Sequence, residues 1–268
     1  LSSSSAASDV YKRQVQDHLA ELEWQAGHGP EFAPGSGERD TWNDIVLRGR
    51  LRNAVRNLNP GVPEEYLDQA IGEVITPKSQ SAIAENRRIH QILVEGYRGI
   101  EYIDHESNVQ NPTIYFLSSQ PHKNDYLSLN QVTITNLDGE RRFDVVCYVN
   151  GMPLAFIELK KTGANTSVEG AYNQLQTYVK EFGMAFRFAN IVIPSDDLSA
   201  KYGTPFTPWN HFAPWNVDED GSPVDPNNMV VAGEPVTQLD LLLDGLFNVE
   251  RFGPVSYTHL RAHETEAD

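Results

Sequence analysis

The segment 141–161, RRFDVVCYVNGMPLAFIELKK, constrains the fold of this chain more than any other. It contains two apolar runs rich in β-branched residues, 143–149 and 153–159, on either side of Asn150-Gly151. Asn-Gly between two apolar runs is typical of a β-hairpin, because both residues tolerate the backbone conformation of a tight turn. The sequence therefore predicts two antiparallel strands near the middle of the chain.

Three charged residues interrupt these apolar strands: Asp144 on the first, and Glu158 and Lys160 on the second. A charge in such a strand is costly unless it is paired or binds a metal. Glu158 and Lys160 are two residues apart and project from the same face. Two carboxylates on neighbouring strands suit a hard divalent cation, Mg²⁺ or Mn²⁺. The lysine would orient a water molecule and offset charge during attack on a phosphoryl group.

The length of the turn decides whether the carboxylates share a face. A strict two-residue loop would place Asp144 opposite Ile157, with the Asp144 and Glu158 side chains on opposite sides of the sheet. A three-residue loop, 149–151, would place Asp144 opposite Phe156 and diagonal to Glu158 on one face. The proposed chemistry therefore predicts the three-residue loop. The alternative is a half-exposed hairpin whose charges protect a sheet edge.

The same residues resemble a known family. The Asp144…Glu158-x-Lys160 hairpin resembles the core of the PD-(D/E)xK nuclease superfamily. More narrowly, FDVVCYVNGMPLAFIELKK resembles the nuclease segment of the R (restriction, motor) subunit of type I restriction enzymes. That family also carries a Gln-x-x-x-Tyr motif on the following helix, which Gln174 and Tyr178 match.

The resemblance extends from about residue 59 to residue 215 and includes Glu85-Asn86-Arg87-Arg88 and Asn130-Gln131. One departure is Phe143, which stands where the family usually has proline before the aspartate. Proline there shapes the entry to the strand and carries no catalytic atom, so we interpret the change as neutral.

By resemblance, the reaction would be metal-dependent hydrolysis of a phosphodiester in double-stranded DNA. Asp144 and Glu158 would bind Mg²⁺ or Mn²⁺, and Lys160 would position the water. Gln174 and Tyr178 are i and i+4 on one helix face and would support the placement of DNA. The alternative for Tyr178 is simple packing against the sheet.

Other ligands would complete the metal site. The backbone carbonyl of Leu159 is one candidate. In related nuclease folds, a helix before the first strand can lend a carboxylate or a histidine, and Glu85, His90 and Glu95 lie on such an expected helix. Each also has a structural interpretation, so none of the three is assigned.

The resemblance also implies partners, namely the methyltransferase and specificity subunits of a type I complex in the cytoplasm. An ATP-driven translocase would follow in the full-length subunit. No G-x-x-x-x-G-K-[ST] phosphate loop occurs in this sequence. ATP is therefore expected only in the missing motor region.

The net charge of the 268 residues is −16, which is unexpected for a protein that binds nucleic acid. It fits a module whose grip on DNA comes mostly from another domain or subunit, and it argues against a stand-alone repair nuclease. A second alternative is a catalytically silent docking module. Its signature would be loss of Asp144, Glu158 or Lys160, and all three are present.

One expected helix, 42–58, carries four arginines: Arg48, Arg50, Arg52 and Arg56. In so acidic a chain, we interpret this helix face as solvated and not as a DNA-binding stripe.

The pattern predicts an α/β fold with a mixed central β-sheet flanked by helices, restriction-endonuclease-like, with a helical N-terminal part. We expect the helical part at 15–80, the nuclease core at 81–200, and a connector towards the translocase at 201–254. The expected helices are 15–24, 42–58, 63–75, 81–95, 168–182 and 238–252. The expected strands, besides the hairpin, are 113–117, 131–135 and 188–193.

The two ends of the chain look foreign. Residues 1–14 and 255–268 resemble translated sequencing-adapter read-through and do not continue the periodicity of their neighbours, so both are expected to be non-native. No apolar run reaches the 18 residues of a membrane span. The single cysteine, Cys147, excludes an internal disulfide.

Overall fold

The computed structural model describes residues 3–137, 139–160, 167–196, 198–218, 220–225 and 228–252. Its main elements are α1 (Ser3–Glu21), β1 (Gln25–His28), α2 (Arg48–Leu58), α3 (Glu64–Ile75), α4 (Ala82–Glu95), β4 (Tyr126–Asn136), β5 (Gly139–Val149), β6 (Met152–Leu159), α5 (Val168–Glu181), β7 (Ile191–Ser195) and α6 (Gln238–Leu246). Two small pairs complete the list, β2 (Tyr102–Ile103) with β3 (Val109–Gln110), and β8 (Val230–Val231) with β9 (Glu234–Pro235).

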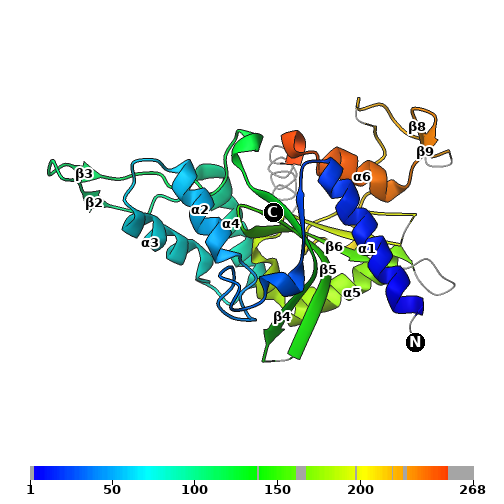
Figure 1. Cartoon of the computed structure of the whole chain (residues 1–268), viewed down its shortest axis with the longest axis horizontal. Coiled ribbons are helices and arrows are strands. Elements are labelled where there is room, and N and C mark those ends of the chain that lie inside the picture. The colour runs from blue at the N-terminus through cyan, green and yellow to red at the C-terminus, as the bar shows by residue number, and fades with distance from the viewer. Residues whose placement is uncertain are drawn as a thin grey trace.

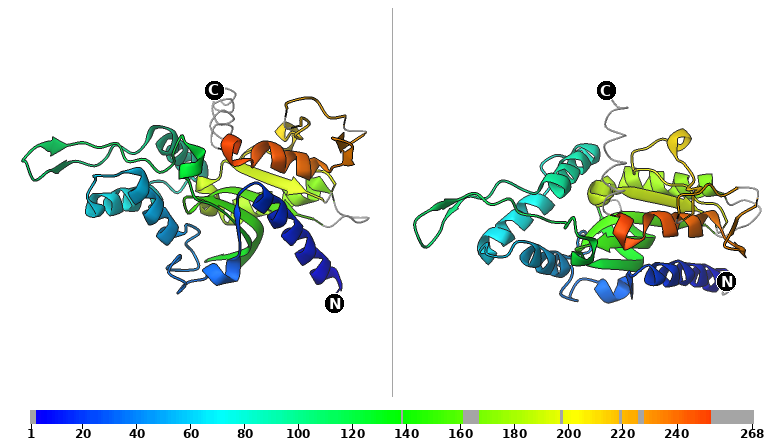
Figure 2. Two further views of the ribbon diagram at one scale, coloured as in Figure 1. Left: turned by 45° about the horizontal axis from the view of Figure 1, so that its top comes forward. Right: turned by 90° about the horizontal axis from the view of Figure 1, so that it is seen from above.

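The centre of the molecule is a five-stranded sheet in the order β1-β4-β5-β6-β7 (Figure 1). β5 runs antiparallel to both of its neighbours, β4 and β6, whereas β1 runs parallel to β4 and β7 runs parallel to β6. Helices α1 and α5 lie on opposite sides of the sheet (Figure 2). The structure therefore confirms the expected mixed α/β fold with a sheet flanked by helices and a helical N-terminal part.

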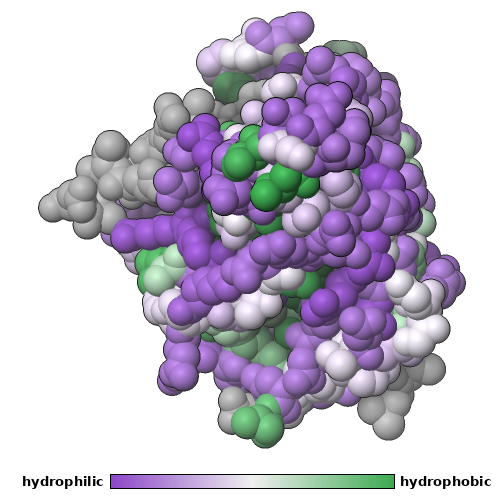
Figure 3. Space-filling model, turned by 90° about the vertical axis from the view of Figure 1, so that its left-hand side faces the viewer, coloured by the Kyte–Doolittle hydropathy of each residue, from purple (hydrophilic) through white to green (hydrophobic). Residues whose placement is uncertain are grey.

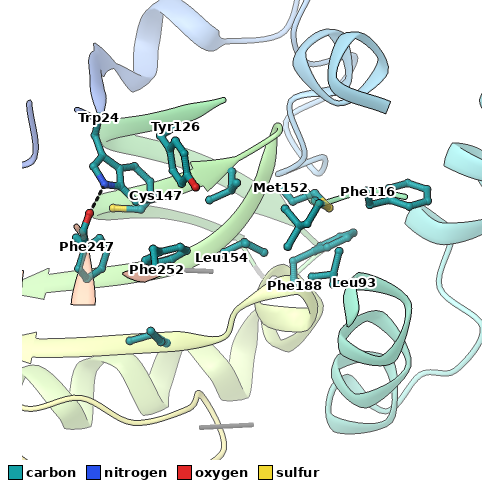
Figure 4. Packing of buried hydrophobic residues seen from close by; sticks show 14 of the residues in the cluster. Trp24, Leu93, Phe116, Tyr126, Cys147, Met152, Leu154, Phe188, Phe247 and Phe252 are labelled. Carbon is teal, nitrogen blue, oxygen red and sulfur yellow. Dashed lines mark hydrogen bonds between the residues drawn. The ribbon is translucent and has the colours of Figure 1, made fainter. Parts of the chain in front are cut away.

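The two faces of the sheet carry separate apolar cores. The larger core contains Trp24, which is 2% exposed, and it joins α1, α6 and the N-terminal helices to the sheet. The Trp24 ring packs against Tyr126 and Phe252, and its indole N–H donates to the Phe247 carbonyl at 2.7 Å (Figure 4). The smaller core lies under α5 and contains Phe143. Burying each of these aromatic side chains contributes about 2–3 kcal/mol, so both faces help to hold the hairpin strands.

The hairpin turn has two residues, so the predicted three-residue loop is wrong. Val149 pairs with Met152, and Asn150 and Gly151 have φ angles of 53° and 78°, which is the geometry of a type I′ turn. The register shifts further along the hairpin, because Leu154 is an extra residue opposite the Cys147/Tyr148 step. This bulge in β6 moves the far half of the strand by one residue.

Packing around the turn explains why it is tight. The Asn150 side chain is fully buried, accepts from the Asp125 N–H at 2.8 Å and donates to the Phe116 carbonyl at 2.9 Å. A Cβ on Gly151 would lie 2.4 Å from the Leu47 carbonyl oxygen. Only glycine fits this close approach to the backbone.

The N-terminal helices α3 and α4 begin and end close to their expected bounds. Helix α2 does not: the expected helix 42–58 starts only at Arg48. The preceding loop is held by the buried Arg39 side chain, which donates to the carbonyls of Asp44 and Trp42 at 2.6 and 3.1 Å. These side-chain hydrogen bonds engage carbonyls that a helix would use, so residues 42–47 form a loop instead of the expected helical turns.

Two strand predictions also need correction. Residues 113–117 form no strand; Ile114 makes a single bridge to Tyr97 at the base of a projecting arm that carries β2 and β3. The expected strand 188–193 begins at Ile191, because Gly183–Phe188 form a 3₁₀ helix.

The side of the molecule from which the arm projects is mostly hydrophilic, with scattered apolar groups (Figure 3). Among the described residues, no helix is long and apolar enough to cross a bilayer.

Candidate active site

Asp144 and Glu158 lie side by side at one end of the central strands. Val145 pairs with Ile157, so the next position along the same register sets Asp144 beside Glu158. The β6 bulge thus sets Asp144 across from Glu158 in the extrapolated register, although the turn prediction was wrong. That the two carboxylates share a metal ion stays a prediction. Asp144 Oδ2 accepts from the Leu159 N–H at 3.0 Å, which orients the carboxylate.

Lys160, Gln174 and Tyr178 form a chain of polar contacts beside Glu158. Lys160 Nζ lies 3.7 Å from Glu158 Oε1 and donates to Gln174 Oε1. Gln174 Nε2 donates to the Tyr178 hydroxyl. Helix α5 brings the last two residues here, and its N-terminus is capped by Ser167 Oγ, which accepts from the Gly170 N–H at 3.1 Å.

Tyr178 also packs, so its two interpretations are compatible. Its side chain is largely buried, and its ring lies edge-to-face on Phe143 with the ring centroids 5.5 Å apart. Burial raises the pKa of Tyr178 to about 12, so the hydroxyl keeps its proton at neutral pH. The hydroxyl remains within reach of Gln174 while the ring belongs to the core under α5.

The electrostatics of the pair favour a cation. Glu158 is only 2% exposed, and burial, reinforced by the neighbouring Asp144 charge, raises the pKa of the Glu158 carboxyl well above its ordinary value. Lys160 and Lys12 oppose that rise. Two carboxylates at this distance from solvent remain ionised together only when positive charge is close.

Lys12 supplies part of that charge and was missed in the sequence. Its Nζ lies 2.8 Å from Asp144 Oδ1, and the residue is 7% exposed. Lys12 stands in the segment expected to be foreign, yet α1 runs without a break from Ser3 to Glu21. Whether residues 1–14 are native stays a prediction. The available signal was helical spacing, since Lys12, Val15 and Leu19 share one face of α1.

A metal ion fits this donor set. The Lys12 ammonium lies against the Asp144 carboxylate, which shows that this carboxylate accepts a cation. Carboxylate oxygens are also the ligands that a hard divalent ion prefers. Within the described part of the chain, no group of three or more His, Cys, Asp or Glu side chains gathers around such a point. The protein would therefore offer two carboxylates, and water or substrate oxygens would complete the coordination, as is usual for Mg²⁺.

The three upstream candidates are engaged elsewhere. Glu85 accepts from the backbone N–H groups of Lys78 and Ser79 and pairs with Arg88 at 2.7 Å. His90 is buried against the 186–190 segment, and burial lowers its pKa to about 4. Glu95 accepts from Gln91 on its own helix at 3.4 Å. Their recorded contacts are structural and lead to neither hairpin carboxylate.

Comparisons with known proteins identify the family of this chain. The family model described as type I restriction enzyme R protein N terminus matches residues 8–211, which is more than half of the chain. The chain belongs to this family. It is the N-terminal region of an R subunit, as the resemblance implied.

Individual relatives carry the same description. The chain is 28% identical over 255 residues to a protein of Methanocaldococcus jannaschii named provisionally as the MjaIXP endonuclease subunit of a type I restriction enzyme. It is 28% identical over 248 residues to the HindI endonuclease subunit of Haemophilus influenzae. Each match covers 90% of this chain but only 24% and 23% of the relative, so the chain spans about a quarter of their length. A third relative, the Escherichia coli EcoprrI endonuclease subunit, is 26% identical over 168 residues, or 60% of this chain and 50% of its own.

Proposed function

We propose that this chain is the endonuclease portion of its R subunit and hydrolyses phosphodiester bonds in double-stranded DNA with Mg²⁺ or Mn²⁺. The single observation that carries the proposal is the partly exposed Asp144 across from the buried Glu158, with Lys160 beside Glu158. The residues and their spacing are those of a PD-(D/E)xK site. Membership of the endonuclease-subunit family supports the same reaction class.

Each residue has a separate role in this proposal. Asp144 and Glu158 hold the metal, which when bound polarises a phosphoryl oxygen and makes its water more acidic. The Leu159 N–H fixes the Asp144 carboxylate. Lys160 orients the attacking water and offsets the charge that develops on the phosphoryl oxygens.

Gln174 and Tyr178 act on Lys160 in this account. Gln174 accepts from the Lys160 ammonium and donates to Tyr178, so it holds the ammonium beside Glu158. The sequence led us to expect that both residues support the placement of DNA. In this proposal Gln174 positions Lys160, and the Tyr178 hydroxyl fixes the orientation of the Gln174 amide. Support of DNA by the exposed side of α5 remains part of the proposal.

The rest of the reaction system is proposed from the family. DNA translocation and ATP hydrolysis would belong to the three-quarters of the relatives that this chain does not match. Recognition and methylation would belong to specificity and methyltransferase subunits, and the complex would act in the cytoplasm.

The test is substitution in the full-length subunit assembled with its partners. Asp144→Ala, Glu158→Ala and Lys160→Ala should each lower DNA cleavage by at least about 100-fold, because each removes electrostatic stabilisation of the reacting phosphate. ATP hydrolysis and assembly should stay near wild type. Matched controls are Asp68→Ala, Glu73→Ala and Lys78→Ala, whose side chains form exposed ion pairs on α3 and beside it. Full cleavage by the Lys160 variant would favour the silent docking module, and equal loss of ATP hydrolysis would indicate a folding role.

A further inference from the structure

A second polar group lies next to Asp144, on the β1 side of the sheet. Asn130 pairs with Val145 and Val132 pairs with Phe143, so Gln131 is the residue of β4 opposite Asp144. Gln131 has a φ of 54°, a left-handed conformation that side chains other than glycine and asparagine rarely adopt in a strand. Such strained positions concentrate at functional sites, where surrounding contacts hold them.

Buried amides orient a histidine beside this position. Gln16 Nε2 donates to the carbonyls of Gly27 and Ser128 at 2.9 and 3.0 Å, so Gln16 Oε1 is the atom that accepts from Asn130 Nδ2 at 2.6 Å. Asn130 therefore presents its Oδ1 oxygen to His28 Nδ1, 2.5 Å away.

This chain of donors fixes the histidine tautomer. Asn130 Oδ1 can only accept, so the proton lies on His28 Nδ1. The other ring nitrogen, Nε2, has no partner among the described residues, and the His28 side chain is exposed. The Gly27 and Ser128 carbonyls thus orient the exposed His28 ring through the side-chain amides of Gln16 and Asn130. A surface histidine without a function does not require such a fixed orientation.

His28 opens onto a polar pocket of about 630 Å³. Its other polar lining residues are Gln16, Asn130 and Gln131, the cation Arg13, and the carboxylates Asp9 and Glu31. β1 and β5 flank β4, and neighbouring strands lie about 4.8 Å apart, so the His28 strand is about 10 Å from the Asp144 strand. Phosphates of one DNA strand follow at about 3.4 Å of helix axis. The pocket is therefore within a few nucleotides of the candidate cleavage site.

We propose that this pocket binds a backbone phosphate of the DNA, a few nucleotides from the phosphate that is cut, and that His28 Nε2–H donates to it. The inference rests on the proposed function. With a proton on both ring nitrogens, His28 offers the phosphate a charged donor at Nε2. A charged donor of this kind gives short, strong hydrogen bonds to phosphate.

The arginines of α2 are already paired with acidic side chains. Arg48, Arg50, Arg52 and Arg56 pair with Asp44, Asp125, Asp68 and Glu64, respectively. In a chain of net charge −16, a DNA contact near the site must therefore come from locally placed donors. His28 is placed by the fold, beside Asn130, which is the β4 neighbour of the Gln131 position opposite Asp144.

The test uses the full-length subunit in its complex and measures both DNA cleavage and DNA-binding affinity as the salt concentration is varied. His28→Ala should lower cleavage about tenfold or more, which is the loss of one charged hydrogen bond. It should also reduce the slope of log affinity against log salt by about one. His28→Lys should restore most of the loss, since an ammonium also donates to phosphate, whereas His28→Asn should not. His105→Ala, on the exposed tip of the arm, is the matched control.

A double-mutant cycle tests the amide relay. Asn130→Ala should lose as much cleavage as His28→Ala, and the double variant should lose no more than either, because both act on one contact. Thermal unfolding of each variant separates this from loss of fold.

Lys160→Ala, measured in parallel, separates the two proposals. If Lys160→Ala abolishes cleavage and His28→Ala cuts like wild type, the phosphate contact is wrong and the nuclease assignment stands. Equal loss in His28→Lys and His28→Ala, with an unchanged salt slope, would also contradict the phosphate contact. Cleavage that survives Lys160→Ala would overturn the proposed function itself.

Discussion

At the scale of single residues, the site depends on the burial of Glu158. A carboxylate that is 2% exposed and adjacent to Asp144 is costly to ionise, and the raised pKa of Glu158 expresses that cost. The folded chain therefore holds a proton on Glu158 more tightly than the unfolded chain does. By linkage, the stabilisation is complete below the ordinary glutamate pKa and is lost as the pH rises through the raised value.

This argument predicts the behaviour of Glu158→Gln. Without divalent metal, the wild-type midpoint of thermal unfolding should fall relative to that of the variant as the pH rises from about 4.5 towards the raised pKa. Mg²⁺ or Mn²⁺ at neutral pH should raise the wild-type midpoint and leave the variant nearly unchanged, because the ion binds the folded state through this carboxylate. Calorimetry with and without metal checks both. Parallel curves with equal shifts on adding metal would contradict a metal site here.

Residue types revealed the candidate site, but not how it is assembled. The charges on apolar strands identified Asp144, Glu158 and Lys160. The two-residue turn fits a close approach of Gly151 to Leu47, which lie about a hundred residues apart in the chain, and no local sequence signal announced the β6 bulge beyond the turn. Lys12 was not considered for the site, because residues 1–14 were expected to be non-native.

Phe143 shows the same limit. The sequence presented it as a neutral replacement for proline. In the structure it is 2% exposed and packs edge-to-face on Phe156, Tyr178 and Phe186, with centroid separations of 5.0–5.6 Å. Phe143 therefore couples the strand that carries Asp144 to the helix that carries Tyr178, a role that depends on three partners distant in sequence.

At the scale of elements, sequence signals succeeded where they were local. Helix α4 begins after Ser81, whose Oγ accepts from the Ala84 N–H, and α3 carries acidic residues in its first turn. Helix 42–58 was mispredicted because the Arg39 side chain donates to the nearby carbonyls of Trp42 and Asp44 and holds a loop there. Strand 113–117 was mispredicted because the Tyr115 N–H donates to the Asn59 side chain, which is distant in sequence. The contact between α1 and α6 could not be predicted from the sequence either, because His18 and its partners Asp240 and Asp244 are more than 200 positions apart.

That attachment gives a second pH prediction. His18 on α1 lies 2.6 Å from Asp244 and 3.4 Å from Asp240 on α6, and these carboxylates raise its pKa to about 10. The resulting stability is complete below the ordinary histidine pKa and is lost as the pH rises through about 10. His18→Gln should therefore lower the free energy of unfolding by about 2 kcal/mol at pH 7, with a smaller difference above pH 10. Denaturant unfolding at both pH values measures this, with His105→Gln as control. A pH-independent difference would show that His18 acts through packing alone.

At the scale of the whole molecule, charge sets the limit on activity. The net charge is −16, and the two terminal segments expected to be foreign carry only −1 of it, which leaves about −15 on the interior. The α2 arginines that could have offset it are each paired with an acid. A polyanion such as DNA is therefore repelled at long range, and the bound metal neutralises only the local carboxylates.

The most direct test of the account is cleavage by this chain when DNA is brought to it. Alone with Mg²⁺, it should show weak or no nuclease activity. Fused to an unrelated double-stranded-DNA-binding domain, which raises the local DNA concentration, it should cut DNA, and Lys160→Ala in the same fusion should abolish the cutting. Cleavage by the fusion that persists without Lys160, or robust salt-tolerant cleavage by the unfused chain, would contradict the account.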